Sequence, residues 1–401
     1  MRLILSYHFV ALMLLLMVAL NLNCQRIKTL TPLLEHIYPT LIPLSPDEYP
    51  SFSDNGDEEV LKHVLKNQIG YFSRLKQPTH YSWGSKTISS TTLKATLEKF
   101  LQLLENDEDK DLNQLIRTYF DVYQSTGEKG NGTVTFTGYY IPQLKGSLEV
   151  NEEYSYPLYR LPDNLIIKEH KPDGLKKAVR IENGKEYPYY TRKQIDQEGV
   201  LRGKGYEIAY LKDPFDCYTL HVQGSGTLIL PDDTLLHLHF SGSNYYPYHS
   251  LREEMLKDGV ISPENASMES IRTYFSEHQE QLQPYLNRNE RYIFFRVWGN
   301  KMVGSLGVEL IPERSIATDK QIFPAGALSY LVTTIPAVNS SMKVERYVPW
   351  SRFVLNQDEG GAIKGSHRVD TFWGTGAQAE AIASHMKQPG KLYYLIAKDM
   401  I

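Results

Sequence analysis

Cysteine is scarce in this chain, since its 401 residues contain only Cys24 and Cys217. Two cysteines can form at most one disulfide, which excludes a fold held together by several bridges. The 12 histidines are scattered, and neither an HExxH motif nor a paired Cys/His spacing is present. Such spacings mark most zinc sites, so the sequence does not support metal catalysis. We expect no metal and no other cofactor.

A strong charge of one sign and long apolar runs are lacking as well. The formal net charge of −4 does not suggest a nucleic-acid-binding protein. The apolar run Phe9–Leu20 has twelve residues, which is too short to span a bilayer. Gly224-Ser225-Gly226 does not match the G-x-S-x-G nucleophile elbow, so a serine hydrolase is excluded by pattern.

The N-terminus reads as an export signal. Arg2 precedes the apolar run, whose length is that of a signal-peptide core, and we expect residues 1–23 to be the signal peptide. Cys24 follows directly, which predicts lipoprotein processing with acylation of its thiol. A plain signal peptide or an uncleaved anchor is the alternative, because Asn23 stands where a small residue is usual. Either reading predicts a cell-envelope protein.

Residues 24–59 are rich in proline and predict a semi-rigid tether. A packed extended segment is the alternative, since the same residues include many apolar side chains. Residues 60–144 are expected to be a helical part that leads into a first barrel. Apolar residues recur there with helical spacing in three segments, and Ser89 and Ser90 are suited to cap the second. The period then becomes that of a strand between Thr133 and Tyr140.

Residues 145–290 predict a small inserted barrel, because short strand-like runs alternate with turn signals. Cys217 lies there in an alternating apolar run and is expected to be a buried, inert thiol. Beyond, the sequence predicts a helix from Ser267, a strand over 292–298, a helix over 377–386 and a strand over 392–396. The expected fold class is α+β, mainly β.

The glycine-rich segment Asn356–Gly376 contains Asp358 and Asp370, and Asp370 is followed by Phe372 and Trp373. Glycine allows close approach of the backbone to a ligand, and a carboxyl group beside apolar rings tends to keep its proton. The segment therefore predicts a carbohydrate site that carries an acid. The alternative is a glycine-rich hairpin whose aspartates only cap turns.

Read together, five segments resemble the membrane-bound lytic murein transglycosylase A family, with its C-terminal 3D domain. The resemblance covers about two-thirds of the chain, and it rests on TGYYIPQLKGS (Thr137–Ser147), YPLYRLP (Tyr156–Pro162), HVQGSGTL (His221–Leu228), ERSIATD (Glu313–Asp319) and DEGGAIKGSHRVDTFWGTG (Asp358–Gly376). Their order and spacing make the signal specific, although each segment alone would be weak.

The resemblance implies a double-psi β-barrel completed by residues 291–401, a second inserted β-barrel domain, and a groove between them. It implies a polysaccharide lyase of the outer membrane that faces the periplasm and acts on peptidoglycan glycan strands. Such enzymes cleave the β-1,4 bond between N-acetylmuramic acid and N-acetylglucosamine and form a 1,6-anhydro ring. Asp370 is then the catalytic residue, as acid and afterwards as base, with Asp358 and Asp319 as supporting carboxylates.

The resemblance also places substrate-binding residues in the groove motifs, namely Thr137, Tyr139, Gln223, Ser225, Lys364 and Trp373. Trp373 and Tyr140 either stack on sugar rings or pack in the core. The sequence departs from the family at Glu359, where an uncharged residue is usual. Two other functions stay open: a non-catalytic wall-binding barrel, and an inverting glycoside hydrolase in which Asp370 works with a second carboxylate.

Overall fold

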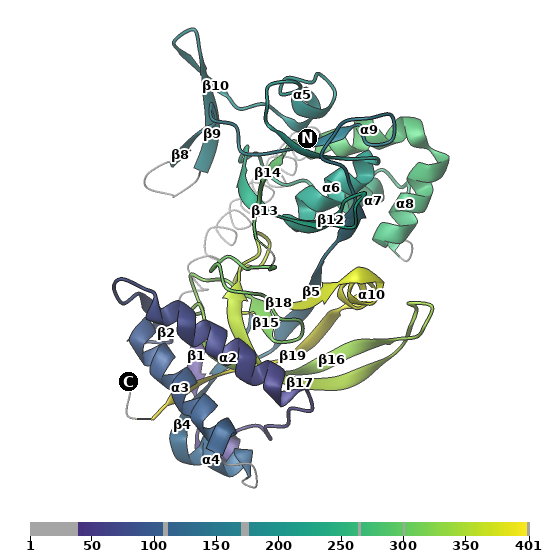
Figure 1. Cartoon of the computed structure of the whole chain (residues 1–401). Coiled ribbons are helices and arrows are strands. Elements are labelled where there is room, and N and C mark those ends of the chain that lie inside the picture. The colour runs from purple at the N-terminus through teal and green to yellow at the C-terminus, as the bar shows by residue number, and fades with distance from the viewer. Residues whose placement is uncertain (1–38, 107–110, 170–175, 264–265, 300, 399–401) are drawn as a thin grey trace, which may run out of the picture.

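The computed structural model describes residues 39–106, 111–169, 176–263, 266–299 and 301–398 (Figure 1). The predicted signal peptide and residues 24–38 of the predicted tether, Cys24 among them, lie outside these residues. No helix in the described part of the chain is long and apolar enough to cross a membrane. The fold is α+β and mainly β, as predicted, and its strands gather into an upper and a lower part (Figure 1).

The lower part is built on a closed six-stranded barrel in which each strand pairs with two neighbours. The ring runs β5, β18, β15, β17, β16, β19 and back to β5. The β15–β17 and β18–β5 pairs are parallel, and the other four are antiparallel. β4 and β1 extend the sheet from β19. The bounds are β1 Leu41–Pro43, β4 Phe120–Ser125, β5 Val134–Ile141, β15 Ser315–Ala317, β16 Leu328–Val338, β17 Val344–Asp358, β18 Arg368–Thr375 and β19 Lys387–Ala397.

The helices predicted before residue 130 pack against this barrel. They are α2 (Glu58–Ser73), α3 (Ser90–Asn106) and α4 (Leu112–Tyr119). The Ser89 hydroxyl accepts from the Thr92 backbone at 3.1 Å, so the predicted cap of the second helix is confirmed at Ser89. Strands β2 (His80–Trp83) and β3 (Lys86–Ser89) join α2 to α3. α10 (Gly376–His385), as predicted from the sequence, lies against β5 and β18.

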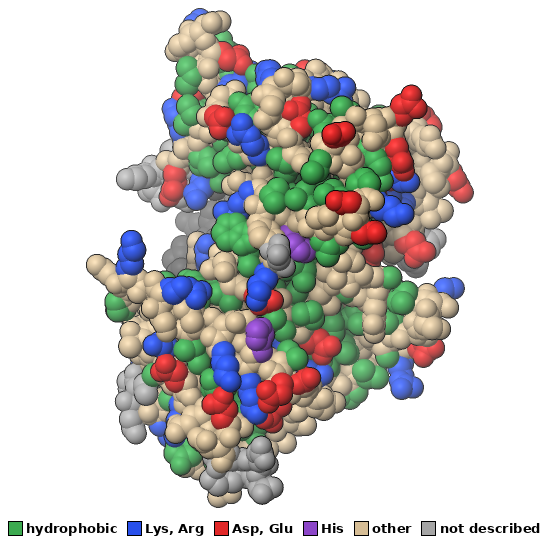
Figure 2. Space-filling view, viewed as in Figure 1, with side chains coloured by type: hydrophobic (Ala, Val, Ile, Leu, Met, Phe, Trp, Pro, Cys, Tyr) green, Lys and Arg blue, Asp and Glu red, His purple; other side chains and the backbone are tan. Residues whose placement is uncertain are grey.

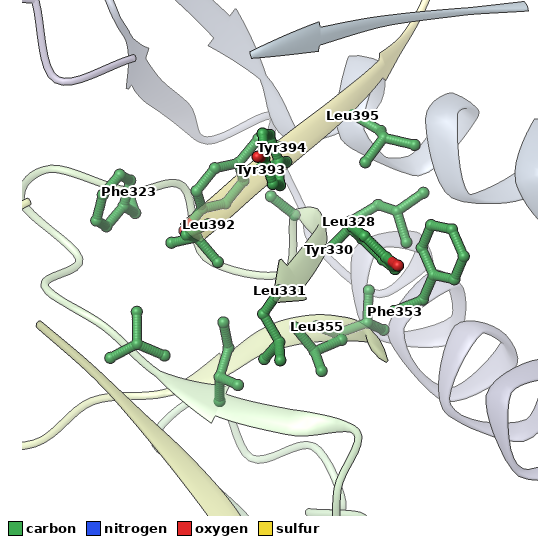
Figure 3. Packing of buried hydrophobic residues seen from close by; sticks show 14 of the residues in the cluster. Phe323, Leu328, Tyr330, Leu331, Phe353, Leu355, Leu392, Tyr393, Tyr394 and Leu395 are labelled. Atoms are coloured by element: carbon green, nitrogen blue, oxygen red, sulfur yellow. The ribbon is translucent and has the colours of Figure 1, made fainter. Parts of the chain in front are cut away.

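The core of the lower part takes side chains from both faces of its long strands, since residues 328–331 of β16 are all buried. In Figure 3, Tyr330 of β16 lies beside Phe353 of β17, with ring centroids 4.8 Å apart. Leu331 of β16 and Tyr394 of β19 belong to the same cluster, and all four side chains are fully buried. Burying side chains of this size is worth about 1.5 to 3 kcal/mol each. The barrel and its helices therefore share one hydrophobic core that spans residues far apart in the sequence.

Residues from Leu41 onward are packed rather than extended away from the body, so the packed alternative to the tether holds for them. β1 pairs with β4, a short 3-10 helix covers Pro46–Glu48, and Phe52 is buried. Asp54 then forms a buried ion pair with Arg314, with Oδ1 3.2 Å from Nη2. Burial of its apolar side chains holds this segment against the body of the protein, so its proline content does not produce an extended tether.

The upper part, residues 143–297, contains a second ring of strands. A four-stranded sheet with the order β14-β13-β12-β6 and a β11-β7 pair are connected by the isolated bridges Ser147↔Tyr210 and Arg160↔Phe295. A separate three-stranded arm has the order β10-β9-β8. The strands are β6 Gln143–Lys145, β7 Tyr156–Tyr159, β8 Ile166–Glu169, β9 Lys176–Glu182, β10 Lys185–Pro188, β11 Glu207–Leu211, β12 Ser225–Ile229, β13 Leu235–Ser243 and β14 Ile293–Val297.

The described residues of this upper part also form helices, with the bounds α5 Arg192–Asp196, α6 Pro214–Gln223, α7 Leu251–Lys257, α8 Met268–Glu277 and α9 Gln279–Arg288. The helix predicted from Ser267 is confirmed as α8, whose cap is the Ser267 hydroxyl. The strand-like reading of the segment around Cys217 is wrong, because this segment is α6. It begins at Asp213-Pro214, one of the turn signals on which the predicted inserted barrel was based, and here Asp213 caps the helix and Pro214 takes the first helical position. Cys217 is nevertheless buried as predicted, and burial raises the pKa of its thiol.

We predict that Asp54→Ala destabilises the protein strongly. The substitution leaves the Arg314 guanidinium buried without its carboxylate, and breaking a buried pair in this way costs about 3 to 5 kcal/mol. Urea unfolding gives the free energy of unfolding directly. As a matched control, Glu98→Ala removes an exposed ion pair with Lys94, so its unfolding midpoint stays close to that of the wild type. Equal shifts for both variants would contradict a role for burial.

Candidate active site

The three aspartates singled out in the sequence gather around β15. Within the barrel, Ala317 of this short strand pairs with Asp358 of β17 on one side and with Asp370 of β18 on the other. Asp319 follows two residues after Ala317. Because β15 pairs with both β17 and β18, Asp358 and Asp370 are brought to the same end of the barrel.

Asp370 lies opposite Thr137 of β5 in the parallel β18–β5 pair. Its neighbours in sequence, Val369 and Thr371, are fully buried, whereas Asp370 itself is only partly buried. Successive side chains of a strand point to opposite faces, so Asp370 points away from the face occupied by Val369. Oδ1 of Asp370 is buried and has no hydrogen-bond partner among the described residues.

This environment favours the protonated form of Asp370. Burial raises the pKa of its carboxyl group to about 6, and the negative charge of Asp358 acts in the same direction. The Thr137 hydroxyl and the positive charge of Arg368 oppose this rise but do not cancel it. A carboxylic acid that is partly protonated near neutral pH, with one oxygen unengaged, is suited to donate a proton.

Asp358 is held by three donors and is therefore in a different chemical situation. Its Oδ2 accepts from the Tyr139 hydroxyl at 2.8 Å, and its Oδ1 accepts from the backbone of Ser305 at 2.8 Å and of Glu359 at 2.9 Å. Burial raises the pKa of Asp358, while these hydrogen bonds act against the rise because they favour the charged form. Both oxygens are thus committed to the protein.

Asp319 organises two loops. Its side chain is buried and accepts from the backbone of Gln321 and of Gly365, each at 3.1 Å. The Lys364 ammonium lies 3.9 Å from Oδ1 and is otherwise exposed. These contacts fix the turn after β15 against the glycine-rich segment, which fits a structural role better than a chemical one.

The other predicted substrate-binding residues fall into two groups. Thr137 and Tyr139 adjoin Asp370 and Asp358, as described above. Gln223 and Ser225 lie at the end of α6 and the start of β12, and both elements contact β5. There the Thr227 backbone donates to the Pro142 carbonyl at 2.9 Å, where the chain leaves β5 for the upper part.

Trp373 is placed in the core. It is 7% exposed, its Nε1 lies 3.3 Å from the Met386 sulfur, and its ring centroid lies 5.2 Å from that of Trp350. A Cβ at Gly138 would meet its indole at 2.7 Å, so glycine is needed opposite it. Two roles were predicted for Trp373, stacking on a sugar ring or packing in the core, and in this structure it packs in the core. Tyr140 is also largely buried, and its hydroxyl donates to Glu380 at 2.9 Å.

Sequence reasoning missed the loop that follows β14. Ser305 of this loop donates to Asp358, and Met302 packs against a small apolar cluster that includes Phe372 and Tyr139. The rings of Tyr139 and Phe372 lie 5.2 Å apart. No spacing or motif marks the loop, and only its glycines hinted at a close approach. Gly304 makes that approach, since a Cβ there would lie 2.6 Å from the Gln357 carbonyl.

Comparison with known protein families gives two matches. The model described as "MltA specific insert domain" matches residues 135–296, and the 3D domain model matches residues 314–396. Together they cover more than half of the chain. The first coincides closely with the upper part of the structure, and the second contains all three aspartates.

Two relatives are similar to this chain over most of its length. The chain is 29% identical over 289 residues to a membrane-bound lytic murein transglycosylase A homolog of Buchnera aphidicola, covering 71% of this chain and 72% of that protein. It is 29% identical over 280 residues to membrane-bound lytic murein transglycosylase A of Vibrio cholerae, covering 68% of each.

A solved structure shares the fold. The crystal structure of a membrane-bound lytic murein transglycosylase from Agrobacterium tumefaciens superimposes with a TM-score of 0.72 at 24% sequence identity, covering 90% of this chain and 98% of that one.

We predict that Asp370→Asn stabilises the protein at pH 8 and has little effect at pH 3. The pKa of Asp370 is higher in the folded chain than in an unfolded one, so ionisation of Asp370 destabilises the folded wild type above pH 6. Asparagine does not ionise and avoids this loss of stability. A rise of about two pKa units corresponds to about 2 to 3 kcal/mol. Thermal unfolding of both proteins across this pH range measures the difference. A difference in stability between the two proteins that does not change with pH would contradict the raised pKa.

Proposed function

The chain belongs to the membrane-bound lytic murein transglycosylase A family, and from this we propose that Asp370 alone serves it as general acid and base. The enzyme is a lytic transglycosylase that acts on peptidoglycan. The bond we propose is the β-1,4 linkage between N-acetylmuramic acid and N-acetylglucosamine, and the proposed product carries a 1,6-anhydro-muramic end. The observation that carries the proposal is the buried, unpartnered Oδ1 of Asp370, together with a pKa raised to about 6.

In the first step, the Asp370 carboxyl gives its proton to the glycosidic oxygen. The bond between C1 and that oxygen breaks, its electron pair stays with the departing N-acetylglucosamine, and positive charge develops at C1. In the second step, the Asp370 carboxylate takes the proton of the C6 hydroxyl while that oxygen bonds to C1. The ring closes without water, and the acid is regenerated. One carboxyl group serves twice because nucleophile and electrophile belong to the same sugar.

Asp358 is better suited to support this reaction than to activate water. An inverting hydrolase needs a second carboxylate with a free oxygen across the scissile bond. Both oxygens of Asp358 are engaged by Tyr139, Ser305 and Glu359, and the neighbouring Glu359 carboxylate is paired with Lys320 at 2.6 Å. The hydrogen bonds to Asp358 favour its charged form, which would stabilise positive charge near C1. A non-catalytic wall-binding barrel would have no use for an acid with a raised pKa.

The remaining roles follow from position. We propose that Thr137, Tyr139, Gln223, Ser225 and Lys364 line the glycan path between the two barrels, because four of them lie on β5 or on elements that contact it. Asp319 maintains the loop after β15. We further propose that acylated Cys24 anchors the enzyme to the outer membrane on its periplasmic face. Mass analysis of the mature N-terminus tests the anchor.

We predict that Asp370→Asn lowers the rate of anhydro-muropeptide release by at least about a hundredfold, because loss of a positioned general acid costs roughly 10² to 10⁴ in rate. Mass spectrometry of peptidoglycan digests gives both rate and product. Asp233→Asn is the matched control: Asp233 is exposed in a turn at φ 63°, a conformation that asparagine tolerates. Release of reducing-end muropeptides without anhydro products would refute the proposed reaction, as would full activity of Asp370→Asn.

The pH dependence provides a second prediction. Since Asp370 must be protonated in the first step, kcat/KM falls as pH rises through about 6. The positive charge of Arg368 lowers the pKa of Asp370, so Arg368→Gln raises that pKa and moves the falling limb to higher pH. Arg346→Gln, on the exposed face of β17, is the control and leaves the limb in place. A limb that moves to lower pH in Arg368→Gln would show that another group is titrating.

A further inference from the structure

A pocket of about 420 Å³ lies between α2 and the loop that follows β14, where the lower and upper parts of the molecule face each other (Figure 1). One wall consists of Lys66 and Gly70 on α2 and of Arg74, which caps its C-terminus. The other wall includes Trp298, Lys301 and Glu309 of the loop. Several lysine and arginine side chains lie at this level on the face seen in Figure 2.

The pocket is connected to the proposed active site through that loop. Ser305 lies within the lining stretch and donates its backbone N–H to Asp358 at 2.8 Å. Met302 of the same stretch packs with Tyr139 and Phe372. A ligand in the pocket therefore contacts the same short loop whose Ser305 holds the Asp358 carboxylate.

The charged side chains that line the pocket favour a negatively charged ligand. The lining contains Lys66, Arg74 and Lys301 and one acidic residue, Glu309. Lys66 is paired with Glu105, which lies outside the lining, at 2.8 Å. The Glu309 carboxylate is already engaged, 2.6 Å from the Lys301 ammonium and 3.4 Å from the Asn67 amide. Within the part of the chain that the structure describes, the Arg74 guanidinium has no carboxylate partner. An arginine in this state is suited to bind a carboxylate through two parallel hydrogen bonds.

Trp298 adds an apolar surface beside these cations. It is 39% exposed although it is large and apolar. Its ring is contacted by two side chains, because the Arg296 guanidinium lies 4.4 Å from its centroid and the His239 ring packs edge-on at 6.4 Å. An exposed aromatic face near the Arg74 guanidinium fits a ligand in which aliphatic carbons adjoin a carboxylate. A neutral sugar would leave the charge of Arg74 without a partner.

We propose that this pocket binds a carboxylate of the peptide stem that the glycan strand carries on N-acetylmuramic acid. The proposal rests on the proposed function, because a lytic transglycosylase meets such stems along its substrate. Stem amino acids supply free carboxylates separated by aliphatic carbons, which matches Arg74, Lys301 and Trp298. The pocket would thereby favour peptide-bearing strands over bare glycan.

Two substrates test the proposal: intact peptidoglycan strands, and the same strands after an amidase has removed their peptides. Arg74→Gln raises KM roughly fivefold to tenfold on peptide-bearing strands, as expected for the loss of a charge-assisted contact, and leaves KM on bare glycan unchanged. Glu309→Gln has the opposite sign and lowers KM on peptide-bearing strands, because it removes the negative charge from the pocket. Lys343→Gln, exposed on the distant β16–β17 hairpin, is the matched control.

A direct binding measurement separates charge from shape. Calorimetry of the Asp370→Asn protein is carried out with a synthetic muramyl tetrapeptide and with its fully amidated form. We expect tighter binding of the free carboxylate form, and Arg74→Gln abolishes the difference. Equal binding of both forms, or equal effects of Arg74→Gln on both strand substrates, would overturn the proposal. Failure of the proposed function looks different, since it removes anhydro products from both substrates whatever residue 74 is.

Discussion

The structure depends on the position of β5 between β18 and β19. β5 closes the barrel, because it pairs in parallel with β18 and antiparallel with the start of β19. This closure satisfies backbone groups that a free edge would leave unpaired. It also places Thr137 beside Val369, 232 residues away in sequence. The chain then leaves β5 directly for the upper part, so one strand closes the barrel, borders the acid and leads to the inserted unit.

The carboxyl groups around β15 illustrate how one scaffold gives similar side chains different properties. Asp370 and Asp358 flank the same residue, Ala317, yet only Asp358 receives three hydrogen bonds. Asp370 has one buried oxygen without a partner, so burial dominates and its pKa rises. This arrangement costs folding free energy when Asp370 ionises. The barrel can bear that cost because its core is large and continuous.

The sequence predicted elements well where a local rule acts alone. The helix after Ser89 and the helix after Ser267 were predicted from cap residues followed by apolar spacing, and both form. Prediction failed where two rules competed. Asp213-Pro214 suits both a turn and a helix start, and only packing of α6 against β5 and β12 decides between them. Residues 41–57 are a second case. Their proline content predicts a tether, whereas their apolar side chains predict a packed segment.

The motifs by themselves determined the family, the α+β class with its barrels, and Asp370 as the residue of interest, because order and spacing of short segments survive without coordinates. Tertiary structure alone decided what surrounds each of those residues. It showed that Trp373 packs on Met386, that Ser305 holds Asp358, and that α2 and the loop after β14 border a pocket with basic side chains. These contacts join residues separated by up to hundreds of positions. Hydrogen bonding and burial depend on distance in space, which sequence spacing does not record.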